Sequence, residues 1–318
     1  MMTPAEIRMK QSPILTSLLL GLGQGSFIAE KLFPRLPSAL SSVTLAKAGD
    51  ERLRKYNLKR APGASTKRID LKFEGQVYTV DQASVEVPIP RELIREADES
   101  RRLNVANYLD ISQIAMVTAN DILLLDYELD VAALATNPAT YAVGHVTTLA
   151  GGTQWSHVDG TPVDDIDAAA QLIRRKTGRR PNRLIFSDDA YQAVKGNLQV
   201  QSYLPDSQLG RPTIDQLRSV FNVEEIVVGD AVWVSEDDVR ADVWGNNAIL
   251  AYVPRMAGSA SISLVEPAFG FTNVIEGHPF AEVPYYSNGF KTWVYGATYE
   301  RRPNVAYNTA AVLFKNPK

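Results

Sequence analysis

Two segments in which apolar and polar residues alternate predict a β-hairpin in the first third of the chain. The apolar positions of the first segment are Ile69, Leu71 and Phe73, and every second residue from 83 to 89 is apolar in the second. This period of two is typical of a strand with one apolar face. The turn is expected at Glu74-Gly75, because glycine adopts the positive φ that tight turns need.

The predicted hairpin has no second layer beside it in the sequence. An isolated hairpin is only marginally stable in water, so its apolar face needs a partner that covers it. A neighbouring copy of the same chain is one obvious candidate. The pattern therefore points to assembly before it points to chemistry.

A long amphipathic helix is predicted directly after the hairpin, over residues 91–136. Asn137-Pro138 ends it, because the residue before a proline avoids the helical conformation. A break between Asn104 and Asp110 fits the sequence, because Asp110 and Gln113 can form a capping pair. The expected buried seam is Ile111, Ala115, Thr118, Ile122, Leu125, Leu129 and Ala132. Because this seam is too short for a coiled coil, the helix is expected to pack on a sheet.

A compact α/β segment follows, and a β-rich third ends the chain. Asp164 or Asp165 is expected to cap a helix that Gly178 ends. The strand NRLIFS and a second helix from Ser187 come next. From Trp244 onward, apolar runs spaced about ten residues apart, with Gly and Pro between them, are typical of antiparallel strands. These elements place the chain in the α+β class.

The charge is unevenly distributed along the chain. The 318 residues carry a net charge of −3, but the first 80 contain 13 lysines and arginines against 6 acidic residues. A basic arm on an acidic body indicates either a surface for nucleic acid or another acidic partner, or simply a solvated charged loop. The residues assigned to this basic arm are Arg52, Arg54, Lys55, Lys59 and Arg60.

The sequence lacks cysteine and lacks an apolar run long enough to cross a membrane. The chain has no cysteine, which excludes disulfides, thiol nucleophiles and thiolate metal sites. The apolar run at residues 14–22 is far shorter than the ~20 residues that cross a bilayer. We therefore expect no membrane partner, and no export by a signal peptide.

A search for reactive groups returns little. The three histidines, His145, His157 and His278, have no carboxylate cluster near them in sequence, so ordinary structural roles are favoured over metal binding. The glycines of residues 21–25 lack the spacing of a nucleotide-binding loop. Asp188-Asp189 is better explained as a helix cap than as an acid–base pair. No catalytic, cofactor-binding or metal-binding residue is predicted, and we expect a protein that is not an enzyme and works through its surfaces.

The order of these parts resembles the major capsid proteins of tailed bacteriophages, which have the fold named after phage Hong Kong 97. Three stretches carry the resemblance: TGRRPNRLIFSDDAYQAVKGN, WGNNAILAYVP and FKTWVYGATYERRPNV. The first is similar to the helix–strand–helix step of that family's axial domain, the second to the strand that leads out of it, and the third to its final long strands. The resemblance covers nearly the whole chain from about residue 30.

This resemblance implies an α+β fold with a long spine helix on an antiparallel sheet, which forms a peripheral domain, and an α/β axial domain. The implied boundaries are an N-terminal arm (1–55), an extended loop (56–90), a peripheral domain (91–155 and 268–303) and an axial domain (156–267 and 304–318). The loop would lie on the adjacent subunit. Its implied contact residues are Lys67, Arg68, Ile69, Leu71, Lys72, Phe73, Tyr78 and Val80.

The same resemblance implies the function and the partners. Copies of the chain would form hexamers and pentamers that close into an icosahedral head around double-stranded DNA, assembled in the host bacterial cytoplasm and retained in the virion. A separate scaffolding protein, a portal, a decoration protein and non-specific contact with packaged DNA are further implied partners. No covalent Lys–Asn link is expected at Lys67 or Lys72, because no Asn and Glu partners can be placed. An encapsulin shell, which shares this fold, and a soluble α+β hydrolase or ligand-binding protein are the alternatives.

Overall fold

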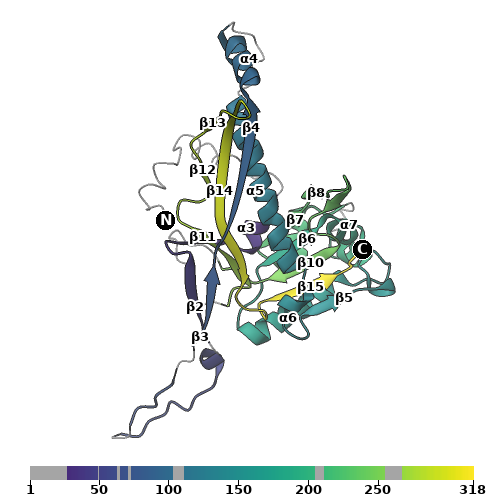
Figure 1. The fold of residues 1–318 in the computed structure, drawn as a ribbon. Helices are drawn as coiled ribbons and strands as arrows, with labels where there is room; N and C mark the ends of the chain where they lie inside the picture. The colour runs from purple at the N-terminus through teal and green to yellow at the C-terminus, as the bar shows by residue number, and fades with distance from the viewer. Residues whose placement is uncertain are drawn as a thin grey trace.

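The computed structural model describes residues 27–48, 50–62, 65–70, 73–102, 111–204, 211–254 and 267–318. The fold is α+β, as predicted. Figure 1 shows an elongated region built on long strands and a long helix, a compact region with a second sheet, and a two-stranded projection that extends away from both.

A six-stranded sheet centred on β14 (Thr292–Val305) forms the elongated region. β4 (Asp81–Pro90) runs antiparallel to β14, from Asp81 opposite Arg301 to Pro90 opposite Thr292. The remaining strands are β11 (Gly270–Ile275), β12 (Phe280–Ala281), β13 (Tyr285–Ser287) and β1 (Arg35–Ser38), of which β1 pairs in parallel with β11.

Helix α5 (Ile111–Ala135) packs on this sheet against β4 and β14. Its buried residues fall in adjacent pairs four positions apart, and the pairs from 115 to 132 are Ala115-Met116, Ala119-Asn120, Leu123-Leu124, Tyr127-Glu128 and Val131-Ala132. The predicted seam is therefore only partly right, because Thr118 and Ile122 are exposed. The physical reason is that two buried positions, Asn120 and Glu128, are polar, and a search for apolar residues passes over them.

The predicted helix over residues 91–136 corresponds to two described helices. α4 (Arg91–Arg102) precedes α5, and the break expected between Asn104 and Asp110 lies outside the described residues. α5 ends at Ala135, and the side chain of Asn137 caps the short 3-10 helix η2 (Pro138–Thr140). The predicted helix stop at Asn137-Pro138 is confirmed.

The predicted hairpin is wrong in its pairing. Glu74 and Gly75 lie inside β3 (Phe73–Thr79), opposite Lys47 and Ala46 of β2 (Ser42–Ala48). The strand that pairs with β3 thus comes from upstream, and the tight turn expected at Glu74-Gly75 does not occur. Glycine permits a turn but does not require one, and the partner of a strand is set by tertiary context rather than by local sequence.

The apolar face of β4 is covered by its own chain, and not by the neighbouring copy that was the candidate cover for the predicted hairpin. Ala83, Val85 and Val87 pack on the buried cluster formed by α5 and the six-stranded sheet. Ile89 is itself buried in that cluster. Among the described elements, β2 and β3 extend out of the body with the loop residues between them, and α4 extends beyond the opposite end of the long sheet (Figure 1).

A five-stranded sheet forms the compact region, in the order β5 (Val146–Thr148), β15 (Ala311–Lys315), β10 (Asn247–Ala251), β6 (Arg183–Ser187) and β7 (Glu225–Gly229). β5 pairs in parallel with β15, although the family resemblance implied that residues 91–155 belong to the peripheral domain. Trp155, Phe186 and Phe314 are fully buried beside this sheet and pack ring against ring.

The helices of the compact region are α6 (Pro162–Thr177), α7 (Asp188–Gly196), α8 (Leu198–Ser202) and α9 (Ile214–Val220). α6 starts at Pro162, earlier than the predicted Asp164 or Asp165, because proline suits the first helical turn. Gly178 follows α6 with φ 74° and ends it, as predicted. The Ser187 hydroxyl accepts a hydrogen bond from the Ala190 amide and caps α7.

Short elements complete the described chain. They are α3 (Ala29–Leu32), the 3-10 helices η1 (Asp50–Leu53) and η3 (Gly151–Thr153), and a two-stranded ribbon of β8 (Val232–Val234) and β9 (Arg240–Asp242). α3 packs on α5, between the two large sheets (Figure 1).

Candidate assembly surface

The projection reaches away from both sheets (Figure 1). β2 and β3 leave the body as an antiparallel pair, and the chain between them reaches well beyond the last strand residues (Figure 1). The described residues of this connection are 50–62 and 65–70, and we call them the basic tip. Nearly all of its side chains with a described burial are exposed, including Leu58 at 69%.

Both sets of basic residues predicted from the sequence meet in the basic tip. Arg54, Lys55, Lys59 and Arg60 are exposed there, and so are Lys67 and Arg68. Arg52 lies in η1 at the start of the same segment. Residues 52–60 follow β2, so the structure places the predicted basic-arm residues in the projection, together with those of the extended loop.

The other predicted contact residues divide between the tip and the base. Ile69 is 41% exposed, and Lys67 lies 5.7 Å above the ring centroid of Tyr56. Phe73 starts β3 opposite Ala48. Leu71 and Lys72 lie outside the described residues.

Tyr78 and Val80 do not project but fix the base of the projection. The Tyr78 ring packs edge-on against Phe271, with 5.7 Å between centroids, and burial raises the pKa of its hydroxyl. The Val80 amide donates to the Ser41 carbonyl at 2.9 Å. The first contact attaches β3 to the six-stranded sheet through β11, and the second ties the two sides of the base together.

A buried carboxylate joins the N-terminal segment to both large regions. The oxygens of Glu128 on α5 accept hydrogen bonds from the amides of Ile28 and Ala29, the shortest at 2.7 Å, and from the Trp244 indole nitrogen at 2.7 Å. Glu128 is fully buried, and burial raises its pKa despite these donors. The sequence analysis missed this residue, because a single Glu in a helix carries no signal of burial.

A second buried charge lies on the other side of α5. Arg301 of β14 is 3% exposed and bonds to Asp126 at 2.8 Å, to Asp130 at 3.4 Å and to the Leu123 carbonyl at 3.2 Å. Its guanidinium also lies 5.0 Å from the ring centroid of Tyr127. Burial raises the pKa of Asp130, although the Arg301 charge opposes that shift.

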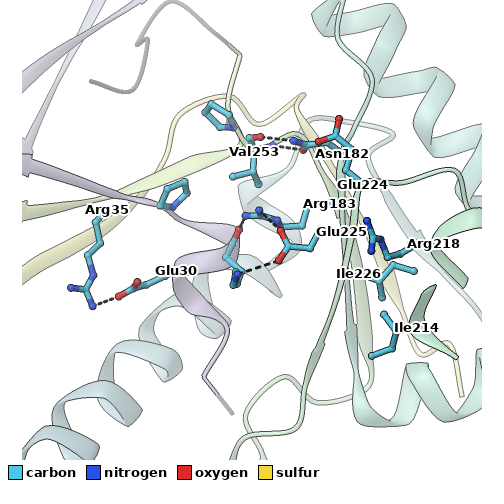
Figure 2. A pocket seen from close by; sticks show the side chains of 13 residues that line it. Glu30, Arg35, Asn182, Arg183, Ile214, Arg218, Glu224, Glu225, Ile226 and Val253 are labelled. Carbon is cyan, nitrogen blue, oxygen red and sulfur yellow. Dashed lines mark hydrogen bonds and ion pairs between the residues drawn. The ribbon is translucent and has the colours of Figure 1, made fainter. Parts of the chain in front are cut away.

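A cavity of about 770 Å³ lies between α3 and the β6–β7 edge of the five-stranded sheet, and Figure 2 shows the side chains that line it. Glu225 pairs there with Arg183 and with Lys31, the latter at 3.2 Å. Burial alone would raise the pKa of Glu225, but Arg183 and Lys31 lower it below its usual value. The ionic groups labelled in this wall mostly bind one another, so the cavity is a polar seam beside the N-terminal segment and not a reactive site.

The three histidines lie in separate structural settings. His145 is buried, with Nδ1 2.9 Å from the Ala311 carbonyl. His157 is half exposed beside Asp159, and His278 packs edge-on against Phe280. Among the residues that the structure describes, no group of three or more His, Asp or Glu side chains could hold a metal ion. In the same part of the chain, no helix is long and apolar enough to cross a membrane.

His278 is expected to make the fold less stable in acid. Its Nδ1 accepts a hydrogen bond from the Glu300 amide at 3.1 Å, and burial lowers its pKa below 6.5, although Glu300 opposes the shift. The stabilisation is therefore present above pH 6.5 and lost as the pH falls through the folded-state pKa. His278→Asn keeps an acceptor but does not titrate, so urea midpoints measured at pH 7.5 and 5 should differ less than in the wild type. The exposed control His157→Asn should keep the wild-type difference, and an unchanged difference in His278→Asn would contradict the assignment.

Comparisons with known proteins identify the family. A family model described as Phage major capsid protein E matches residues 141–280. The major capsid protein of Burkholderia phage BcepMu is 32% identical over 271 residues, which cover 85% of this chain and 85% of that relative. The chain belongs to the family of phage major capsid proteins.

This capsid protein also matches solved structures over nearly its whole length. A phage-related protein from Bordetella bronchiseptica RB50 is 36% identical, with a TM-score of 0.76, and the match covers 96% of this chain and 97% of that one. The capsid of cyanophage P-SCSP1u has the same fold at 13% identity, with a TM-score of 0.54 and coverage of 93% and 89%. An encapsulin shares the fold as well. The predicted Hong Kong 97-type fold is confirmed.

The family assignment fixes the class of function. This capsid protein is a structural component of a tailed-phage virion and not an enzyme, and it assembles with copies of itself. The encapsulin interpretation is set aside because the sequence relatives are phage capsid proteins. The hydrolase and ligand-binding interpretations are set aside for the same reason.

Proposed function

We propose that copies of this chain form hexamers and pentamers that close into an icosahedral head around double-stranded DNA, and that the projection of each copy lies on an adjacent copy. The observation that carries this proposal is the basic tip, which is exposed and reaches away from its own body (Figure 1). A two-stranded ribbon is marginal when isolated, and its described contacts with the body lie at its base. Contact with an adjacent copy would cover the rest of the ribbon and the basic tip.

The division into domains follows the two sheets. The proposed peripheral domain holds residues 91–155 and 268–303, and the proposed axial domain holds 156–267 and 304–318. One change to these boundaries is supported by strand pairing, since β5 pairs with β15 and belongs with the axial domain. The pairing of β2 with β3 likewise shifts the proposed extended loop from 56–90 to residues 42–79 and shortens the arm, while β4 joins the six-stranded sheet.

The other partners stay predictions from the resemblance. A separate scaffolding protein, a portal and a decoration protein would act during or after assembly in the host cytoplasm. Non-specific contact with packaged DNA was expected from a basic arm, and the basic residues now belong to the projection. These residues therefore no longer support contact between a basic arm and DNA. Their place in the projection favours a contact with an adjacent subunit.

Replacing residues 49–72 by Asn-Gly tests the proposed role of the loop. Ala48 and Phe73 are cross-strand partners, so a two-residue turn can join them without disturbing the ladder. The variant is expected to fold with a wild-type circular dichroism spectrum but to form no closed shells in electron micrographs. A second variant replaces residues 49–72 by a Gly/Ser linker of the same length. It separates the effect of chain length on assembly from the effect of side-chain contacts. Normal shells from the Asn-Gly variant would refute the role of the loop.

A further inference from the structure

We infer that the basic tip of one copy docks on an acidic hairpin of an adjacent copy, formed by residues 230–242 with β8 and β9. This inference rests on the proposed function and names the surface that receives the loop. The partner is a second copy of this chain.

The acidic hairpin carries a strong, uncompensated charge. Residues 230–242 include five acidic residues, which are Asp230, Glu236, Asp237, Asp238 and Asp242, and one arginine. All five are exposed. No ion pair links Glu236, Asp237 or Asp238 to a cation within the described ranges, so these charges are available to a partner. In contrast, Asp126 and Asp130 on α5 already pair with Arg301.

The basic tip has the opposite charge. Its described residues include seven lysines and arginines and three acidic residues. In the part of the chain that the structure describes, no ion pair holds Arg54, Lys55 or Lys59. Complementary potentials steer association and fix the register of an interface, and the carboxylates of the hairpin supply the charge that complements the tip.

Apolar side chains accompany the charges on both surfaces. Leu53 and Leu58 of the tip are 56% and 69% exposed, and Val232, Val234 and Val239 of the hairpin are 49%, 53% and 60% exposed. Val232 and Val234 are two residues apart in β8 and therefore share one face of the ribbon. Single exposed apolar residues are ordinary, but a group of them rimmed by charge is typical of an interaction surface.

The two surfaces lie on opposite sides of the molecule. Figure 1 shows the tip at the far end of the projection and β8 at the distant edge of the compact region. One chain cannot bring them together, so the contact joins different surfaces of two copies. Such a head-to-tail contact closes into a ring when the rotation between subunits closes. The arrangement thus fits the proposed capsomers.

Engineered cysteines test this contact, because the chain has none of its own. Assembled particles of Leu58→Cys with Val234→Cys, treated with a short bis-maleimide, are expected to give a ladder of covalent oligomers on a denaturing gel. Each single variant should give no ladder. The matched control is Leu58→Cys with Val158→Cys, because Val158 is 65% exposed and lies outside the hairpin. This pair should give no ladder. Closed shells without a ladder from the first pair would overturn the inference and leave the proposed function standing.

Charge reversal gives a second, independent measurement. Lys55→Glu with Lys59→Glu, and separately Glu236→Lys with Asp237→Lys, are each expected to reduce shell yield at least tenfold at low salt. Combining all four substitutions should restore assembly, because the attraction is re-formed with its sign exchanged. Failure of the combination to restore shells would overturn the inference, as would hairpin substitutions that change nothing. If added double-stranded DNA blocks modification of Leu58→Cys and no ladder forms, the tip binds nucleic acid instead.

Discussion

Replacing Glu128 by alanine is expected to lower the free energy of unfolding by about 3 kcal/mol, since breaking a buried charged cluster strands its partners. The side chain is fully buried and accepts hydrogen bonds from the amides of Ile28 and Ala29 and from the Trp244 indole. All three donors would lose their acceptor inside the protein. The measurement is urea denaturation of the unassembled chain, followed by tryptophan fluorescence.

Two control variants separate the cluster from the helix. Asp121→Ala changes an exposed carboxylate on the same helix and should change stability by no more than about 0.5 kcal/mol. Trp244→Phe removes only the indole donor, and in a double-mutant cycle with Glu128→Ala it should couple strongly, because the two groups share a hydrogen bond. Additive losses in that cycle would contradict the proposed cluster.

The same substitution should release the N-terminal segment. Glu128 holds the first residues of α3 against α5 and against Trp244 of the compact region. We therefore expect Glu128→Ala to increase proteolytic cleavage near residues 27–33 before the rest of the chain unfolds. An intact N-terminal segment in a destabilised variant would show that other contacts hold it.

Replacing Arg301 by methionine is the second large expected effect, at about 3 kcal/mol of lost stability. The guanidinium is 3% exposed and is bound by Asp126, Asp130 and the Leu123 carbonyl. Methionine fills similar space, so the loss measures the charge and the hydrogen bonds more than a cavity.

Arg302 provides the matched control for Arg301. It is the next residue in β14, is 46% exposed and pairs with Asp81 at 3.5 Å. Exposed pairs contribute little because water and salt screen them. Arg302→Met should therefore change the free energy of unfolding by no more than about 0.5 kcal/mol. Equal losses for the two arginines would refute the distinction between the buried and the exposed pair.

Local signals in the sequence predicted the helix ends well. Gly178 ends α6 and Ser187 caps α7, because backbone conformation and short-range hydrogen bonds decide these positions. Asn137-Pro138 stops the long helix for a similar reason. Such features depend on a few consecutive residues and need no knowledge of the rest of the chain.

Strand partners could not be predicted in the same way. The segment from Ile69 to Phe73 was predicted to pair with the segment that forms β4, but β3 runs through the predicted turn and pairs with β2, while β4 pairs with β14 more than two hundred residues later. Each strand shows a period of two whichever partner it has. The places of the predicted contact residues differ for the same reason. Tyr78 packs at the base of the projection, and the residues predicted as a basic arm lie in the basic tip.

The sequence by itself determined the class of fold, the order of the parts, the absence of cysteine chemistry and the resemblance to phage capsid proteins. Only the tertiary structure decided that Glu128 and Arg301 are buried, that β4 is covered by its own helix, and that basic and acidic surfaces lie at opposite sides. The reason is physical. Periodicity and capping act between near neighbours, whereas burial, strand pairing and charge geometry depend on residues that the fold brings together from distant positions.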